Sequence, residues 1–76
     1  MRPLYLIAQE IYSDWKNVNF AAKPYLDAME CMESIHSQFF ADSGKSVVAY
    51  FLSNATDWRG ETAKPVKAEL KGMLKG

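Results

Sequence analysis

This 76-residue chain has one cysteine, one histidine and no net formal charge. Because Cys31 is the only cysteine, no intrachain disulfide can form, which is typical of proteins in the reducing cytosol. The zero net charge means that composition alone favours neither a nucleic-acid nor a membrane partner. No apolar run approaches the ~20 residues that span a bilayer, and Gln9 and Glu10 interrupt any signal-peptide core. We therefore expect a cytoplasmic protein with no membrane partner.

The shortage of histidine and cysteine also argues against a catalytic or metal site. Catalysis by His36 needs a positioned acid, base or nucleophile beside it. Cys31 lies about 140° away around a helix axis, so a Cys–His dyad is not expected. We expect His36 to be half-buried at the edge of the core instead. One histidine and one cysteine cannot fill a tetrahedral zinc site without carboxylates. We predict a protein that is not an enzyme and needs no metal or cofactor.

Apolar and aromatic side chains are abundant, at 49% and 13% of the sequence. A domain of this length buries only about 60% of its extended surface, so its core must be dense in apolar atoms. The ten aromatic rings exceed what a minimal core needs. We therefore predict a single domain, residues 1–76, that leaves some rings at the surface for a partner.

The first two of four predicted helices carry apolar residues at helical spacing, about 100° per residue. The first begins near Pro3, which suits an opening helical turn, and ends before the Asn-containing stretch 16–19. Its apolar face consists of Leu4, Ile7, Ala8, Ile11 and Trp15. The second begins near Pro24, and its apolar face continues to His36. Residues 37–41 are compatible with a final helical turn or with a loop that places Phe39 or Phe40 in the core.

The third and fourth predicted helices cover residues 47–58 and about 61–74. Asp42 or Ser43 is a suitable N-cap for the third helix, and Gly60 can take the left-handed conformation that ends it. Pro65 must lie in the first turn of the fourth helix, because an interior proline costs ~3 kcal/mol. The fold class predicted is all-α: a compact four-helix bundle, orthogonal or up-down, with either four full helices or three long ones and a short one.

Two short motifs suggest chemistry but have simpler interpretations. Gly44-Lys45-Ser46 resembles the end of a phosphate-binding loop, which also needs a glycine five residues before that Gly-Lys pair and a preceding strand. Position 39 is Phe, so a helix cap is the preferred interpretation. Asp57 and Glu61 lie on either side of Trp58, and paired carboxylates can perform acid–base chemistry. The preferred interpretation is that an acid near Arg59 forms an ion pair with it.

A lysine arc is the strongest basic candidate site. The arc spans roughly 80° of a helical surface and consists of Lys64, Lys67, Lys71 and Lys75. It lies in the segment 59–76, which contains five basic and two acidic residues. The arc is either a solvated face or a contact for phosphate or an acidic protein. Only Arg59 could add a bidentate contact, so sequence-specific base reading is not expected.

Tyrosines at the edges of the apolar faces are candidate partner contacts. Tyr5 and Tyr12 form a ridge beside the first helix, and Tyr50 flanks the third. Such rings are either the rim of a core or interface residues that keep the hydroxyl hydrated.

Several short sequence motifs together resemble those of a family of small proteins. They are Pro3-Leu4-Tyr5, Asp14-Trp15-Lys16, Pro24-Tyr25-Leu26-Asp27-Ala28-Met29, Tyr50-Phe51-Leu52-Ser53-Asn54-Ala55 and Trp58-Arg59-Gly60-Glu61-Thr62-Ala63. The chain is similar to small uncharacterised proteins encoded by phages, prophages and related mobile elements of low-GC Gram-positive bacteria. The resemblance implies a cytoplasmic accessory role and assigns no catalytic residue.

The preferred functional prediction is a non-enzymatic protein–protein interaction module. It would dock through exposed Tyr and Trp edges, with lysines at the rim, onto an unidentified protein or a second copy of the chain. The alternative is a small nucleic-acid-binding protein that uses the lysine arc.

Overall fold

The computed structural model describes residues 2–39 and 42–75. The helices are α1 (Leu4–Asp14), α2 (Lys23–Met29), α3 (Gly44–Ser53) and α4 (Ala63–Lys75). Two-residue strands β1 (Gln38–Phe39) and β2 (Asp42–Ser43) pair antiparallel ahead of α3. The four helices agree with the all-α class predicted from the sequence, and the prediction did not include this small hairpin. The prediction that Phe39 or Phe40 fills the core falls on side chains outside the described part.

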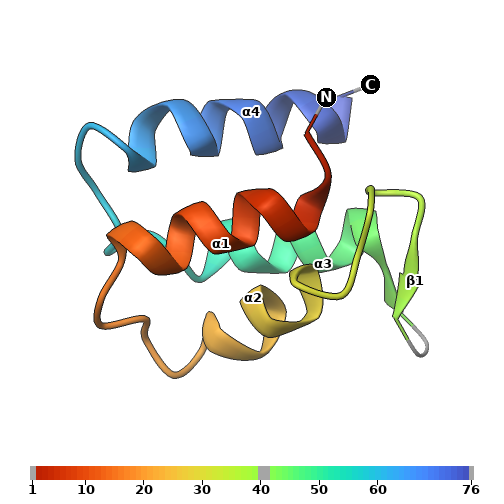
Figure 1. Cartoon of the computed structure of the whole chain (residues 1–76), viewed down its shortest axis with the longest axis horizontal. Coiled ribbons are helices and arrows are strands. Elements are labelled where there is room, and N and C mark those ends of the chain that lie inside the picture. Colours follow the sequence, from red (N-terminus) through yellow and green to blue (C-terminus); the bar gives the residue numbers. More distant parts are fainter. Residues whose placement is uncertain (1, 40–41, 76) are drawn as a thin grey trace.

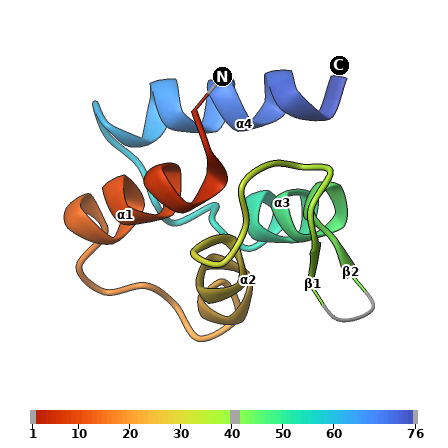
Figure 2. The same cartoon turned by 45° about the vertical axis from the view of Figure 1, so that its right-hand side comes forward.

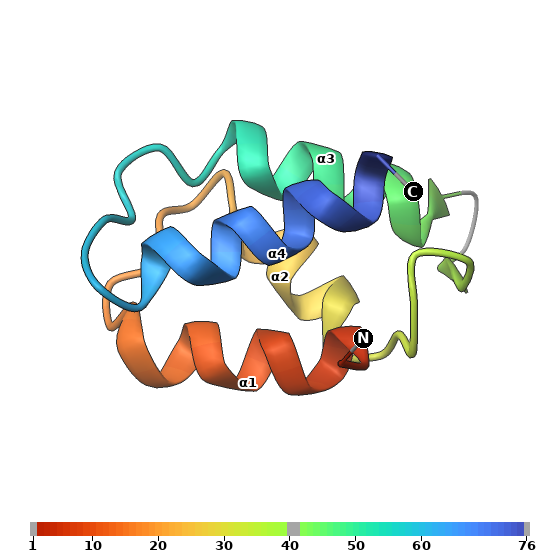
Figure 3. The same cartoon turned by 90° about the horizontal axis from the view of Figure 1, so that it is seen from above.

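Helices α1 and α3 lie at the same level of the molecule, at opposite edges, and each packs against both α2 and α4 (Figures 1 and 2). Helix α4 packs on one side of this pair and α2 on the other. Seen from above, α4 crosses over the space between α1 and α3 and runs opposite to α1 (Figure 3). The whole molecule measures 29 × 24 × 19 Å along its principal axes.

The core is apolar, with no buried polar or charged side chain among the described residues. The predicted face of α1 is confirmed, since all of its members are buried: Leu4, Ile7, Ala8, Ile11 and Trp15. Trp15 stacks on Trp58 with ring centroids 5.8 Å apart, and Phe51 meets both rings edge-on. Burying an apolar side chain of this size stabilises a fold by about 1.5–3 kcal/mol, so this aromatic cluster is a major part of the core.

Helix α2 is shorter than predicted, because it ends at Met29 rather than continuing toward His36. After the C-cap residue Glu30, the N–H groups of Cys31 and Met32 each bond to a carbonyl three residues back, which tightens the chain into a turn. Met32 is still buried, but it reaches the core from a loop. His36 is exposed rather than half-buried.

The loop after α2 caps the starts of two helices. Its Met32 and Glu33 carbonyl oxygens accept from the first N–H groups of α1, and its Ile35 and Ser37 carbonyls accept from those of α3. These donors have no partner inside a helix. Ser43 is the N-cap of α3, as predicted, and its Oγ accepts from the Ser46 N–H at 3.2 Å.

Helix α3 is also shorter than predicted and ends at Ser53. The Asn54 backbone N–H and its side-chain Nδ2 both donate to the Tyr50 carbonyl oxygen, which closes the last turn. Trp58 therefore reaches the core from the following loop. Gly60 has a positive φ of 123° as expected for a left-handed residue, but it lies in this loop and does not end α3. Pro65 lies in the first turn of α4, as predicted.

Candidate functional site

Lys67 differs from the other lysines of the predicted arc because it is partly buried. Its half-buried ammonium donates to the Ala55 carbonyl oxygen at 2.6 Å and also to the Trp58 carbonyl oxygen. It lies 5.8 Å from the centroid of the Trp58 ring. Lys67 thus connects α4 to the loop after α3 and is not available as a free surface cation.

Electrostatics around Lys67 are those of a positive cluster. Burial lowers the pKa of Lys67, and the charges of Lys71 and Arg59 lower it further, while Asp57 acts in the opposite direction. The other arc members, Lys64, Lys71 and Lys75, are exposed on α4. The structure therefore divides the predicted arc into three surface lysines and one lysine with a structural role.

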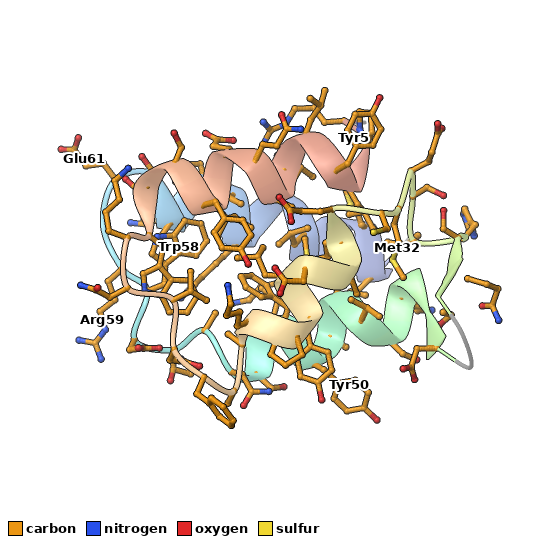
Figure 4. All side chains as sticks on the ribbon, turned by 60° about the horizontal axis from the view of Figure 1, so that its bottom comes forward. Tyr5, Met32, Tyr50, Trp58, Arg59 and Glu61 are labelled. Carbon is orange, nitrogen blue, oxygen red and sulfur yellow. The ribbon has the colours of Figure 1, made fainter. Side chains whose placement is uncertain are left out.

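An open hollow of about 500 Å³ lies beside Lys67, between the loop and the start of α4. It is lined by residues 58–61 of the loop and by Ala63, Lys64 and Lys67 of the helix, and we call it the Trp58 hollow. Figure 4 shows Trp58 turned toward the interior, whereas Arg59 and Glu61 project outward. The hollow thus has an apolar base and a charged rim.

Trp58 is fixed in place from several sides. Its indole Nε1–H donates to the Asp14 carboxylate at 2.9 Å, one ring face stacks on Trp15, and only 2% of the residue is exposed. The prediction that tryptophan edges are exposed for docking is therefore wrong, because both tryptophans are needed to fill the core of so short a chain. Gly60 allows the chain to turn directly after this anchor.

Within the described part of the chain, Arg59 does not form the ion pair with a nearby acid that was predicted from the sequence. Its Nε donates to the Thr56 carbonyl oxygen at 3.3 Å. Among the described residues, the ion pairs within 4.0 Å join Arg2 to Glu10 and Glu69. Arg59 and Lys64 therefore present their charge to solvent at the hollow's rim.

Asn19 positions the loop that forms the hollow and was not singled out from the sequence. Its Nδ2 donates to the Asn54 carbonyl oxygen at 2.8 Å and to the Asp57 carboxylate at 2.7 Å. Its Oδ1 accepts from the Ala22 N–H at 2.7 Å, an arrangement that asparagine favours in turns. The asparagine-containing stretch before α2 was a signal for a turn, but its long-range bonds depend on the tertiary fold.

The tyrosine candidates have three different environments. Tyr5 is half-buried on α1. The Tyr12 hydroxyl donates to Asp27, and burial together with this bond raises the pKa of Tyr12. Lys23 lies over the Tyr12 ring at 5.4 Å from its centroid, so the hydroxyl and one face of the ring already have partners within the fold. Only Tyr50 presents much of its surface, with 51% exposed.

Two aromatic features lie at the surface: the single ring of Phe20 and the stacked pair of Tyr25 and Tyr50. Tyr50 stacks on Tyr25 with ring centroids 5.4 Å apart. Phe20, which follows Asn19 in the loop before α2, is 95% exposed. Sequence reasoning missed Phe20 because a phenylalanine in an unassigned stretch carries no periodic signal.

Comparison with protein-family models, curated proteins and solved structures returned no match. In the described ranges, no three His, Cys, Asp or Glu side chains are grouped as metal ligands. No helix formed by these residues combines the length and apolar character needed to cross a membrane.

Proposed function

We propose that this chain is a non-enzymatic protein–protein interaction module. We further propose that it is an accessory protein of the kind encoded by phages, prophages and related mobile elements of low-GC Gram-positive bacteria. In this proposal the four helices act as a small, rigid bundle that displays side chains to a partner. The observation that supports it best is the nearly complete exposure of Phe20.

Phe20 is displayed on an ordered loop rather than on a loosely held one. The preceding residue, Asn19, makes side-chain hydrogen bonds to three other residues. Covering a phenylalanine removes enough apolar surface from water to contribute about 1.5–3 kcal/mol. A backbone held in place loses little conformational freedom on docking. An exposed ring carried on such a backbone is therefore suited to insertion into a partner's pocket.

Tyr50 and Tyr25 provide a second aromatic contact, a stacked pair that joins α3 to α2. The Asn19 side chain bonds to the Asn54 carbonyl, and the Asn54 side chain bonds to the Tyr50 carbonyl. These bonds connect the loop carrying Phe20 to the helix carrying Tyr50. Tyrosine suits an interface because its ring can be covered while its hydroxyl remains hydrated.

Site-specific photo-crosslinking tests the proposal. A benzophenone side chain replaces Phe20 or Tyr50 in turn, and Ala68, exposed on α4, is the matched control position. In a lysate of a low-GC Gram-positive bacterium, we expect one adduct of defined mass from positions 20 and 50 and none from position 68. An adduct with a second copy would identify a homo-oligomer, which sedimentation velocity would verify. A strictly monomeric protein with no position-dependent adduct would contradict the proposal.

The second candidate function is nucleic-acid binding through the exposed cations of α4. It is supported by the exposure of Lys64, Lys71 and Lys75 along one helix. With three phosphate contacts, the plot of log K against log salt should have a slope of about −2.7 for duplex DNA. Lys64→Glu combined with Lys71→Glu should abolish binding. Indifference to duplex and single-stranded probes at low salt would exclude this function.

A further inference from the structure

The Trp58 hollow combines an apolar base with unpaired positive charge at its rim. Trp58 and Ala63 lie at the base but are almost fully buried, so most of the accessible apolar surface comes from the stems of the rim side chains. At about 500 Å³ the hollow falls within the range of ligand pockets, roughly 300–1,000 Å³. Its volume is therefore sufficient for one large apolar side chain.

The charges at the rim are strongly biased toward one sign. Arg59, Lys64 and Lys67 line the hollow, while Glu61 is the one acidic residue in the lining. Lys71, one turn further along α4, is close enough to lower the pKa of Lys67. In a chain of zero net charge, this concentration of cations creates a local positive potential that favours carboxylates.

A nucleic acid fits this hollow less well than an acidic peptide does. Base stacking needs an accessible aromatic face, but Trp58 stacks on Trp15 and has the Lys67 ammonium over its ring. Lys67, the central cation, already donates to two backbone carbonyls.

We propose that the Trp58 hollow binds an acidic segment of a partner protein, with one large apolar side chain in the hollow and flanking Asp or Glu carboxylates on Arg59 and Lys64. The proposal rests on the proposed function as an interaction module and specifies the chemistry of a partner. Arg59 can make the paired, planar contact with a carboxylate that guanidinium groups favour. The apolar side chain provides the burial and the carboxylates provide the orientation.

The test is an NMR titration of the ¹⁵N-labelled full chain with a synthetic nonapeptide that has a central phenylalanine between Asp and Glu residues. The matched control peptides replace its acids with lysine or its phenylalanine with serine, and a twelve-nucleotide oligothymidylate tests the nucleic-acid alternative. We expect shifts confined to residues 58–67, including the Trp58 indole N–H signal. Neither control peptide nor the oligonucleotide should produce them at the same concentration.

Variants of the rim sharpen the test. Arg59→Glu with Lys64→Glu should weaken peptide binding by ~tenfold or more, equivalent to about 1.4 kcal/mol. Lys75→Glu makes the same charge change at the far end of α4 and should alter binding less than about twofold. Because Arg59 and Lys64 are exposed, both variants should fold, and Arg59→Gln with Lys64→Gln provides a milder pair.

Three results would overturn the proposal: no shift at millimolar peptide, equal weakening by Lys75→Glu, or the same shifts with the oligonucleotide. Each is distinguishable from failure of the proposed function, because cross-linking from Phe20 reports on a different surface. A position-dependent adduct at Phe20 without peptide binding rejects the hollow alone.

Discussion

Replacement of Lys67 by methionine should destabilise the fold more than any other loss of charge on α4. Methionine keeps a flexible, unbranched stem beside Trp58 but cannot donate hydrogen bonds. The Ala55 and Trp58 carbonyl oxygens would both lose the ammonium donor that they share. These carbonyls lie in the loop that carries Trp58 into the core, so the loss affects the connection between α3 and α4.

The magnitude follows from the number of bonds and their exposure. A hydrogen bond to a charged group contributes about 1.5–3 kcal/mol net, and Lys67 makes two. Two effects reduce this value: Lys67 is only half-buried, so water can approach the site that its ammonium vacates, and burial disfavours the ammonium form, as its lowered pKa indicates. We therefore expect a loss of about 2 kcal/mol in the free energy of unfolding, or a fall in Tm of about 10 °C.

Urea unfolding monitored by tryptophan fluorescence is the assay, with calorimetry for Tm. Lys71→Met is the matched control, since Lys71 is exposed one turn away on the same helix. It should change the free energy of unfolding by no more than about 0.5 kcal/mol. If the two variants unfold at the same urea concentration, the Lys67 bonds contribute nothing measurable and the structural role assigned to Lys67 is wrong.

Two further predictions concern the starts of the helices and the pH dependence of stability. Gly44→Ala should lower the free energy of unfolding in urea by about 1–3 kcal/mol, because the new Cβ would lie 2.5 Å from the Ser34 carbonyl oxygen. Gly72 has open space around it, so Gly72→Ala should instead stabilise α4 by about 0.5–1 kcal/mol. Equal effects of the two substitutions would refute the packing argument. The two-pronged hydrogen bond from Arg2 lowers the pKa of Glu69. Its contribution to stability is therefore present above the ordinary glutamate pKa of about 4.3 and is lost as pH falls through the lower folded-state pKa. Glu69→Gln should therefore be less stable than the parent by up to about 1 kcal/mol at pH 7, and a difference that persists unchanged at pH 2 would contradict this linkage.

The sequence predicts the elements of this fold better than their ends. The apolar face of α1 could be predicted because its spacing is set by the helix itself. Trp58 continues the spacing of α3, so it appeared to belong to that helix, yet the chain leaves the helix at Asn54. Tertiary hydrogen bonds from Asn19 and Lys67 hold this exit, and no local pattern encodes them.

The sequence predicts which residue types form the candidate site but not which of them bind within the fold and which remain exposed. Periodicity makes Lys64, Lys67 and Lys71 equivalent members of one arc. They differ because Lys67 reaches the backbone carbonyls exposed where α3 ends, and the position of that end was itself mispredicted. Phe20 was missed for the opposite reason, since an exposed ring in a loop obeys no periodic rule.

The structural role of Lys67 also determines which substitutions can test binding. Removing Lys67 perturbs the loop that forms the Trp58 hollow, so a loss of peptide or DNA binding in such a variant would not separate folding from recognition. Lys64 and Lys71 carry the same charge on the same helix without these backbone contacts. Peptide binding through the hollow should depend on Lys64 and Arg59 more than on Lys75, because only the first two line it. Phosphate binding along α4 should depend on Lys64, Lys71 and Lys75 about equally, because backbone contacts to a nucleic acid are nearly interchangeable. The ranking of these single-charge variants therefore distinguishes the two partner classes even before a partner is identified.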